Sequence, residues 1–135
     1  MFVYNTTYPI SNYQKLIQFW KVIIMNTIKI STRFSINTPN TTENHALFSA
    51  KLKERNPYML IANAFRSIFG GIPNLKQIKS KQEKAFNSPN APTNFDGEYQ
   101  VKLPANATLE QNQQFCKELD AVFRKYEIHN KAELV

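Results

Sequence analysis

The stretch TIKISTRFSI, residues 27–36, is the most regular part of the sequence and sets the expected fold. Apolar and polar residues alternate along it: Ile28, Ile30, Phe34 and Ile36 fall on one face, and Lys29, Ser31, Arg33 and Ser35 on the other. Successive side chains of a strand point to opposite faces of a sheet. The alternation therefore predicts a half-buried strand with one solvated face.

Two further segments show weaker alternation, FVYNTTY at residues 2–8 and EYQVKL at 98–103. Each has the composition and spacing of a short strand. In FDGEY, Asp96 and Glu98 flank Gly97, which is typical of a turn leading into the second of these strands. The sequence therefore predicts a small mixed or antiparallel sheet of two to three strands.

Apolar residues recur at helical spacing in most of the remaining chain, which predicts four to five helices. The helical segments are residues 11–24, 42–55, 57–69, 72–86 and 108–126. Asn56 is a suitable N-cap before Pro57, and Gly70 or Gly71 follows the end of that helix. Thr108 and Gln111 have the spacing of a capping box. We expect an α+β fold, in which the helices cover the sheet in one domain spanning residues 1–135.

The segment SNYQKLIQFWKVIIMN, residues 11–26, contains the single tryptophan, Trp20. Its apolar stripe predicts a core helix, and a membrane-surface or partner-docking helix is the alternative. It is too short to cross a bilayer core of ~30 Å. Met25 is an alternative translation start, in which case residues 1–24 form an N-terminal extension.

The composition is that of an ordinary globular domain, with 42% apolar and 20% charged residues among 135. The single cysteine, Cys116, excludes an internal disulfide and a multi-thiolate zinc site. A reducing cytoplasm fits this cysteine usage, and no cofactor or metal is expected. Abundant Asn, Lys and Ile are typical of A/T-rich coding sequences, as in some bacteria and their phages.

The net charge is +7, and it is concentrated in residues 51–84. The basic residues of this region are Lys51, Lys53, Arg55, Arg66, Lys76, Lys79, Lys81 and Lys84. Such a concentration indicates an anionic partner, with a solvated surface as the alternative. Residues 57–86 would form a helix, a turn and a second, basic helix, although the turn is longer than that of the usual DNA-binding motif.

Catalytic patterns are weak. His45 and His129 lie far apart in the sequence, and Cys116 falls on the apolar stripe of the last helix, where a thiol is usually an inert core residue. A pairing of Cys116 with His129 would need the C-terminal tail to fold back.

The sequence thus favours a small basic, non-enzymatic, cytoplasmic binding protein of bacterial, phage or mobile-element origin that contacts nucleic acid through residues 51–84. The alternative is a protein-binding inhibitor or adaptor that docks on an acidic partner surface. An enzyme built on Cys116 or His45 is the third hypothesis.

Overall fold

A computed structural model describes residues 27–88 and 90–135 of the chain. Its elements, in chain order, are β1 (Thr27–Ile36), α2 (His45–Glu54), α3 (Pro57–Phe69), β2 (Asn74–Lys84), β3 (Thr93–Lys102), α4 (Leu109–Lys125) and β4 (His129–Leu134). The predicted strand at residues 2–8, the predicted helix at 11–24 with Trp20, and the alternative start at Met25 lie outside the described residues.

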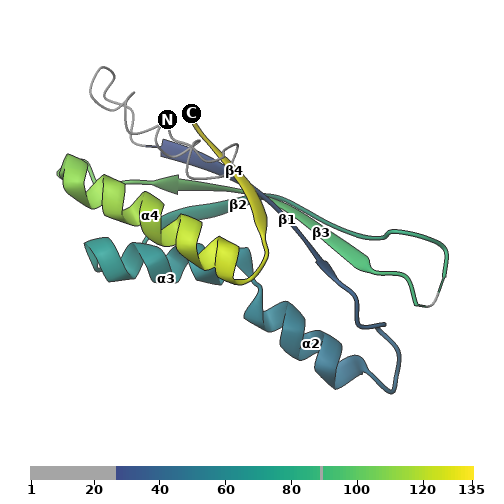
Figure 1. The fold of residues 1–135 in the computed structure, drawn as a ribbon. Helices are drawn as coiled ribbons and strands as arrows, with labels where there is room; N and C mark the ends of the chain where they lie inside the picture. Colours follow the sequence, from purple (N-terminus) through teal and green to yellow (C-terminus); the bar gives the residue numbers. More distant parts are fainter. Residues whose placement is uncertain (1–26, 89) are drawn as a thin grey trace, which may run out of the picture.

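The four strands form one antiparallel sheet in the order β2-β3-β1-β4. Helices α2 and α3 connect β1 to β2, a hairpin joins β2 to β3, and α4 connects β3 to β4 (Figure 1). This β-α-β-β-α-β connection is the ferredoxin-like arrangement. It leaves β2 and β4 at the two edges and β1 and β3 in the centre.

Strand β1 is a central strand with one buried face, as its alternation predicts. Ile28, Ile30, Phe34 and Ile36 are all buried. The strand pairs with β3 along its whole length and with β4 along its middle part. The predicted half-buried strand at residues 27–36 is therefore confirmed, and it organises the sheet.

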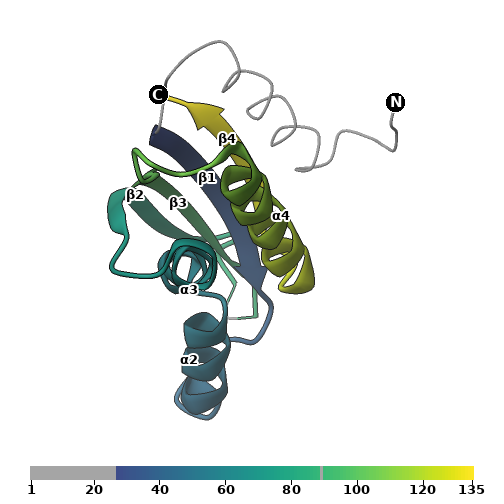
Figure 2. The same cartoon turned by 90° about the vertical axis from the view of Figure 1, so that its left-hand side faces the viewer.

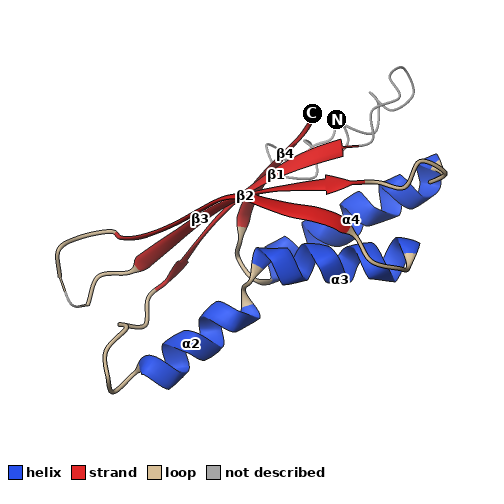
Figure 3. Cartoon of the chain, turned by 180° about the vertical axis from the view of Figure 1, so that it is seen from behind, coloured by secondary structure: helices blue, strands red, loops and turns tan. Residues whose placement is uncertain are grey.

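Helices α3 and α4 cover one face of the sheet, and no helix of the described residues covers the opposite face (Figures 2 and 3). The core between the helices and the sheet includes Phe65 on α3 and Phe115 on α4, whose rings meet edge to face with centroids 6.0 Å apart. Burying aromatic rings of this kind supplies much of the free energy that holds such a layer together.

The predicted helix ends are confirmed where their caps could be read from the sequence. The Asn56 side chain accepts a hydrogen bond from the Tyr58 amide, Pro57 begins α3, and Gly70 follows its end with a positive φ of 71°. Thr108 and Gln111 exchange the two hydrogen bonds of a capping box at the start of α4. Capping satisfies amides that would otherwise lack a partner.

The predicted architecture is wrong in its numbers, although the α+β class fits. A sheet of two to three strands under four to five helices was expected. The described residues instead form a four-stranded antiparallel sheet on which two helices, α3 and α4, pack, with α2 diverging from the sheet beside them (Figure 1).

The largest error concerns residues 72–86, which were expected to form a basic helix and instead contain β2. The strand carries a β-bulge between Gln77 and Lys79, where Ile78 is the extra residue. Leu75 and Ile78 have the three-residue spacing of a helix, but only Leu75 is buried, and Ile78 is 45% exposed at the bulge. Phe86, the last residue of the segment that was expected to be helical, is 70% exposed.

The third strand is longer than expected, and the fourth was not predicted. Asp96, Gly97 and Glu98 lie in the middle of β3 rather than in a turn before it. Residues 129–134 form β4, which pairs with β1. Such a short segment is stabilised by hydrogen bonds to an existing central strand. The sequence of the segment alone does not show that these bonds will form.

Candidate anion-binding face

The open face of the sheet is composed of polar and charged side chains arranged in rows across the strands. One row joins Lys76, Gln100, Lys29 and Glu133, and the next joins Lys79, Glu98, Ser31 and Lys131. A third row joins Lys81, Asp96, Arg33 and His129. We call this surface the open face. With Glu83 and Lys102 it holds seven cations and four carboxylates, a surplus of three positive charges.

The bulge in β2 is what places three lysines on this face. Strand residues two apart share a face, so Lys79 and Lys81 belong together, whereas Lys76 would fall on the opposite side of a regular strand. Because Ile78 is the extra residue, Lys76 lies opposite Gln100 and Lys79 lies opposite Glu98. Gln100 and Glu98 share the open face of β3, so all three lysines lie on that side.

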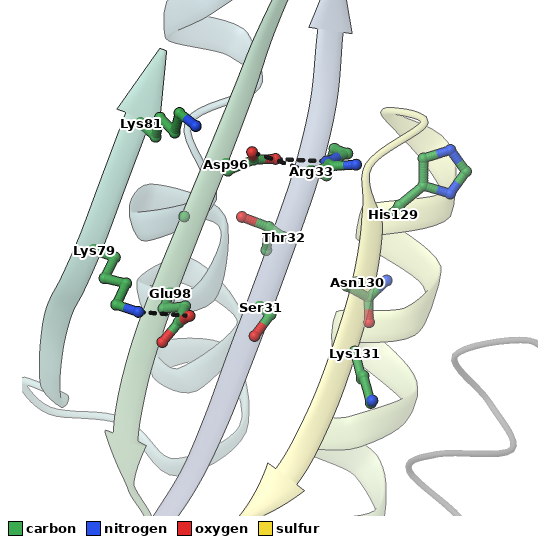
Figure 4. A pocket seen from close by; sticks show the side chains of 11 residues that line it. Ser31, Thr32, Arg33, Lys79, Lys81, Asp96, Glu98, His129, Asn130 and Lys131 are labelled. Atoms are coloured by element: carbon green, nitrogen blue, oxygen red, sulfur yellow. Dashed lines mark hydrogen bonds and ion pairs between the residues drawn. The ribbon is translucent and has the colours of Figure 1, made fainter. Parts of the chain in front are cut away.

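Ion pairs link neighbouring strands across the open face. Arg33 Nε lies 2.6 Å from Asp96 Oδ1, and Lys29 Nζ lies 2.9 Å from Glu133 Oε1. Lys79 Nζ lies 3.8 Å from Glu98 Oε2 (Figure 4). Such pairs between exposed side chains contribute little stability, but they orient the side chains in rows.

Hydrogen bonds and opposite charges keep these groups ionised. The Arg33 hydrogen bond lowers the pKa of Asp96, and the Lys29 hydrogen bond lowers the pKa of Glu133. The same contacts raise the pKa of Lys29 and Arg33, and Glu83 raises the pKa of Lys81. These five groups are therefore ionised near neutral pH.

A shallow depression of about 620 Å³ runs across the centre of the open face between β2 and β4. Figure 4 shows Lys79 and Lys81 at one side of it and His129 and Lys131 at the other, with the Arg33–Asp96 pair between them. Within the described chain, Lys76, Lys102 and Lys131 have no carboxylate oxygen within 4.0 Å. These ammonium groups can take an external anion without first breaking an internal pair.

The structure divides the eight basic residues predicted from the sequence. Lys76, Lys79 and Lys81 come together on the open face. Lys84 ends the same strand opposite Thr93, on the other side of the sheet. The remaining four belong to the α2–α3 region: Lys51 and Lys53 lie in the last turn of α2, Arg55 caps it, and Arg66 lies on α3.

Three of these four make structural hydrogen bonds, and Lys51 Nζ donates to Thr38 Oγ1 at 2.7 Å. Arg55 Nη1 donates a 2.8 Å hydrogen bond to the backbone oxygen of Ser35, and Arg66 Nη1 donates to Asn63 Oδ1 at 3.1 Å. The predicted basic second helix of a helix–turn–helix is wrong, because residues 74–84 form the strand β2. The basic region is two surfaces rather than one.

Sequence reasoning did not include Lys29, Arg33, Lys102 and Lys131 in the candidate site. Lys29 and Arg33 were already placed on the polar face of the strand at 27–36. Their alternation could have identified them, but only the topology places them on the same face as the β2 lysines, with β3 between the two strands.

The residues considered for catalysis are not brought together. Cys116 is buried in the core on α4, where burial raises its pKa to about 12. His129 lies on the open face, on the other side of the sheet. His45 is exposed at the start of α2, with Nδ1 3.3 Å from Asn40 Oδ1. In the described part of the chain, no three His, Cys, Asp or Glu side chains are grouped to hold a metal ion.

No helix among residues 27–88 and 90–135 has the length and apolar character needed to cross a membrane. No protein-family model and no curated protein matches the sequence.

Two solved structures share a distant likeness with the chain. One is an amidase of the hydantoinase/carbamoylase family from Burkholderia multivorans, with 11% identity over 82% of this chain and a TM-score of 0.41. The other is an aminobenzoyl-glutamate utilization protein from Klebsiella pneumoniae, with 12% identity over 82% of this chain and a TM-score of 0.33. The chain spans 27% and 28% of their lengths, and at these TM-scores the likeness assigns no function.

Proposed function

We propose that the protein is a non-enzymatic binding protein that holds an anionic partner, nucleic acid first, on the open face of its sheet. The observation that carries this proposal is that Lys76, Lys79 and Lys81 lie on one face of β2, which they share with Lys29 and Arg33 across β3. Rows of cations at strand spacing can neutralise successive phosphates, which is the main source of sequence-independent affinity for nucleic acids.

In this proposal the open face contacts the sugar–phosphate backbone of the nucleic acid rather than its bases. Stacking platforms for single strands present aromatic rings on the central strands. Here the central strands present Ser31, Arg33, Asp96 and Glu98 on that side. Phosphate contacts without stacking predict weak sequence preference and a strong dependence on salt. A cytoplasmic location and a bacterial or phage origin, both expected from the composition, belong to the same proposal.

The test is a fluorescence anisotropy titration of labelled duplex and single-stranded oligonucleotides across a series of salt concentrations. The variant Lys76→Gln/Lys79→Gln/Lys81→Gln removes three cations from the open face. On duplex DNA it should flatten the log–log salt slope by about 2.7, at roughly 0.9 per lost phosphate contact.

Two controls match this variant. Lys51→Gln/Lys117→Gln/Lys125→Gln removes the same charge from the helices, and Lys84→Gln changes the same strand on its other side. Both should leave the salt slope unchanged. The proposal would be refuted if neither duplex nor single-stranded oligonucleotides bound near physiological salt. It would also be refuted if the helix control flattened the salt slope as much as the β2 variant.

A second candidate is an adaptor or inhibitor that docks on an acidic protein surface. The carboxylates of Glu83, Asp96, Glu98 and Glu133 lie between the cations of the open face, a mixed pattern that a protein can complement better than a uniform polyanion. Glu98→Gln separates the two candidates. It should strengthen oligonucleotide binding by removing repulsion, whereas it should weaken a protein complex that pairs with Glu98.

A further inference from the structure

A second cavity, of about 480 Å³, lies on the helix-covered side of the sheet at the point where α2 diverges from it. Its floor consists of side chains from β1, β2 and β3, and its wall is formed by α2 and the start of α3. Cavities of this size hold small organic molecules. The sheet separates it from the open face, so what it binds is independent of the proposed function.

The floor of this cavity is aromatic. The Phe34 and Phe95 rings stack with centroids 5.0 Å apart and planes 15° apart. Tyr99 lies two rows further in, beyond Gly97, and is 5% exposed. Phe95 is only partly buried and lines the cavity, so its ring offers a flat apolar surface to a ligand. A planar ring matches such a floor because aromatic groups stack or meet edge to face.

Gly97 and Tyr99 keep the floor flat. A Cβ atom on Gly97 would lie only 2.8 Å from the Tyr99 hydroxyl oxygen and 2.9 Å from Cε1. The phenol ring therefore lies directly over the strand at Gly97. The neighbouring Thr32 side chain is 5% exposed, and it partly offsets the rise in the Tyr99 pKa that burial causes.

The Thr32 hydroxyl nevertheless has no hydrogen-bond partner of good geometry in the described chain. Its oxygen is itself buried beside the Tyr99 phenol, so the polar groups offered to a ligand come from β2. Ser80 lies two positions across the sheet from Thr32, through Gly97, and adds a second hydroxyl to the same row. The cavity therefore combines an apolar floor with polar groups at one side.

The rim carries one cation, Lys53, from the last turn of α2. Its side chain is exposed, and no carboxylate oxygen in the described chain lies within 4.0 Å of its ammonium group. The groups of β2 that line the other side are neutral amides and a hydroxyl. A negative charge is thus favoured at the α2 rim.

We propose that this cavity is a binding site for a small aromatic carboxylate. The ring stacks on Phe95 beside Tyr99, and the carboxylate pairs with Lys53. Neutral hydrogen-bonding groups of the ligand face Gln77 and Ser80 on β2.

The experiment is a titration of the ¹⁵N-labelled full-length protein by NMR with three probes. These are naphthalene-2-carboxylate, its neutral carboxamide and cyclohexanecarboxylate. The aromatic carboxylate should shift amide signals of residues 49–57, 77–82 and 95–99. The carboxamide and the non-aromatic acid should each bind about tenfold more weakly, the usual size of a lost charge-assisted hydrogen bond or ring contact.

Two variants give the test its specificity. Lys53→Gln should weaken binding of the aromatic carboxylate about tenfold and leave binding of the carboxamide unchanged. Lys117→Gln on α4 should change the binding of neither ligand. Ser49→Trp should fill the cavity from the exposed face of α2 and abolish binding, with the NMR spectrum reporting that the fold is kept. Absence of shifts, shifts confined to the open face, or equal binding in Lys53→Gln would overturn the proposal.

Discussion

Arg33 and Asp96 form a two-bonded ion pair across the two central strands of the sheet. Arg33 Nε donates to Asp96 Oδ1 at 2.6 Å, and Nη2 donates to Oδ2 at 3.2 Å. The two residues are direct partners in the β1–β3 register. This pair lies at the centre of the open face and holds the Arg33 guanidinium in place there. The planar guanidinium group can pair with the oxygens of a phosphate as it does with those of a carboxylate.

Replacing Arg33 by Gln should raise the pKa of Asp96, because the Arg33 hydrogen bond is the main cause of its lowering. A carboxylate with a lowered pKa stabilises the fold above its unfolded pKa of ~3.9, and this stabilisation is lost as pH falls through the folded pKa. The variant should therefore lose less stability than the wild type on acidification. NMR titration of the Asp96 carboxyl carbon measures the change, and an unaltered pKa would show that the pair is absent in solution.

Cys116 should be inert in the native protein, because burial raises its pKa to about 12 and leaves no thiolate near neutral pH. A thiol reagent should label it only after denaturation. Cys116→Ala should lower the free energy of unfolding by roughly 0.5–3 kcal/mol while leaving oligonucleotide binding unchanged. Labelling at the same rate in native and denatured protein would contradict its burial.

Gly97→Ala should destabilise the protein by about 1–3 kcal/mol, the usual cost of overpacking. The new methyl group would lie 2.8 Å from the Tyr99 hydroxyl oxygen and 3.0 Å from Cζ. Chemical denaturation measures the loss. In a Tyr99→Leu background the same substitution should cost less, since the ring that it meets is gone. Equal costs in the two backgrounds would show that the contact does not matter.

Thr108→Ala should cost about 0.5–2 kcal/mol, because it removes the hydroxyl that accepts from the Gln111 amide at 3.1 Å. The companion bond from the Thr108 amide to Gln111 Oε1 would lose its fixed geometry. Thr42→Ala, at an exposed position before α2, is the control and should be nearly neutral. Thermal unfolding followed by circular dichroism measures both.

Deleting Ile78 should leave the pairing of β2 intact, because Gln77 and Lys79 already face the consecutive residues Tyr99 and Glu98. The lysines would stay on the open face, and oligonucleotide binding would persist. Deleting Gln82 instead removes a paired residue and moves part of the strand to the wrong face. Hydrogen exchange of β2 and β3 amides measures both. Loss of protection in the Ile78 deletion would mean that the bulge itself is required.

The sequence by itself determined the elements that can be recognised from residues close together in the chain. The alternation of residues 27–36 identifies the central strand and its buried face. Asn56 with Pro57, and Thr108 with Gln111, locate the starts of α3 and α4 because a capping side chain bonds to amides only two or three residues away. The burial of Cys116 follows from its place in an apolar helical stripe.

Only the tertiary structure decided β2, β4 and the open face. The spacing of Leu75 and Ile78 is typical of a helix, and only the pairing with β3 shows that both belong to a bulged strand. The short β4 is stable because β1 provides its hydrogen-bond partners. The cations of the open face come from strands as far apart as residues 29 and 131, and strand order alone makes them neighbours. Contacts between residues distant in sequence carry no local periodicity, so they depend on how the whole chain packs.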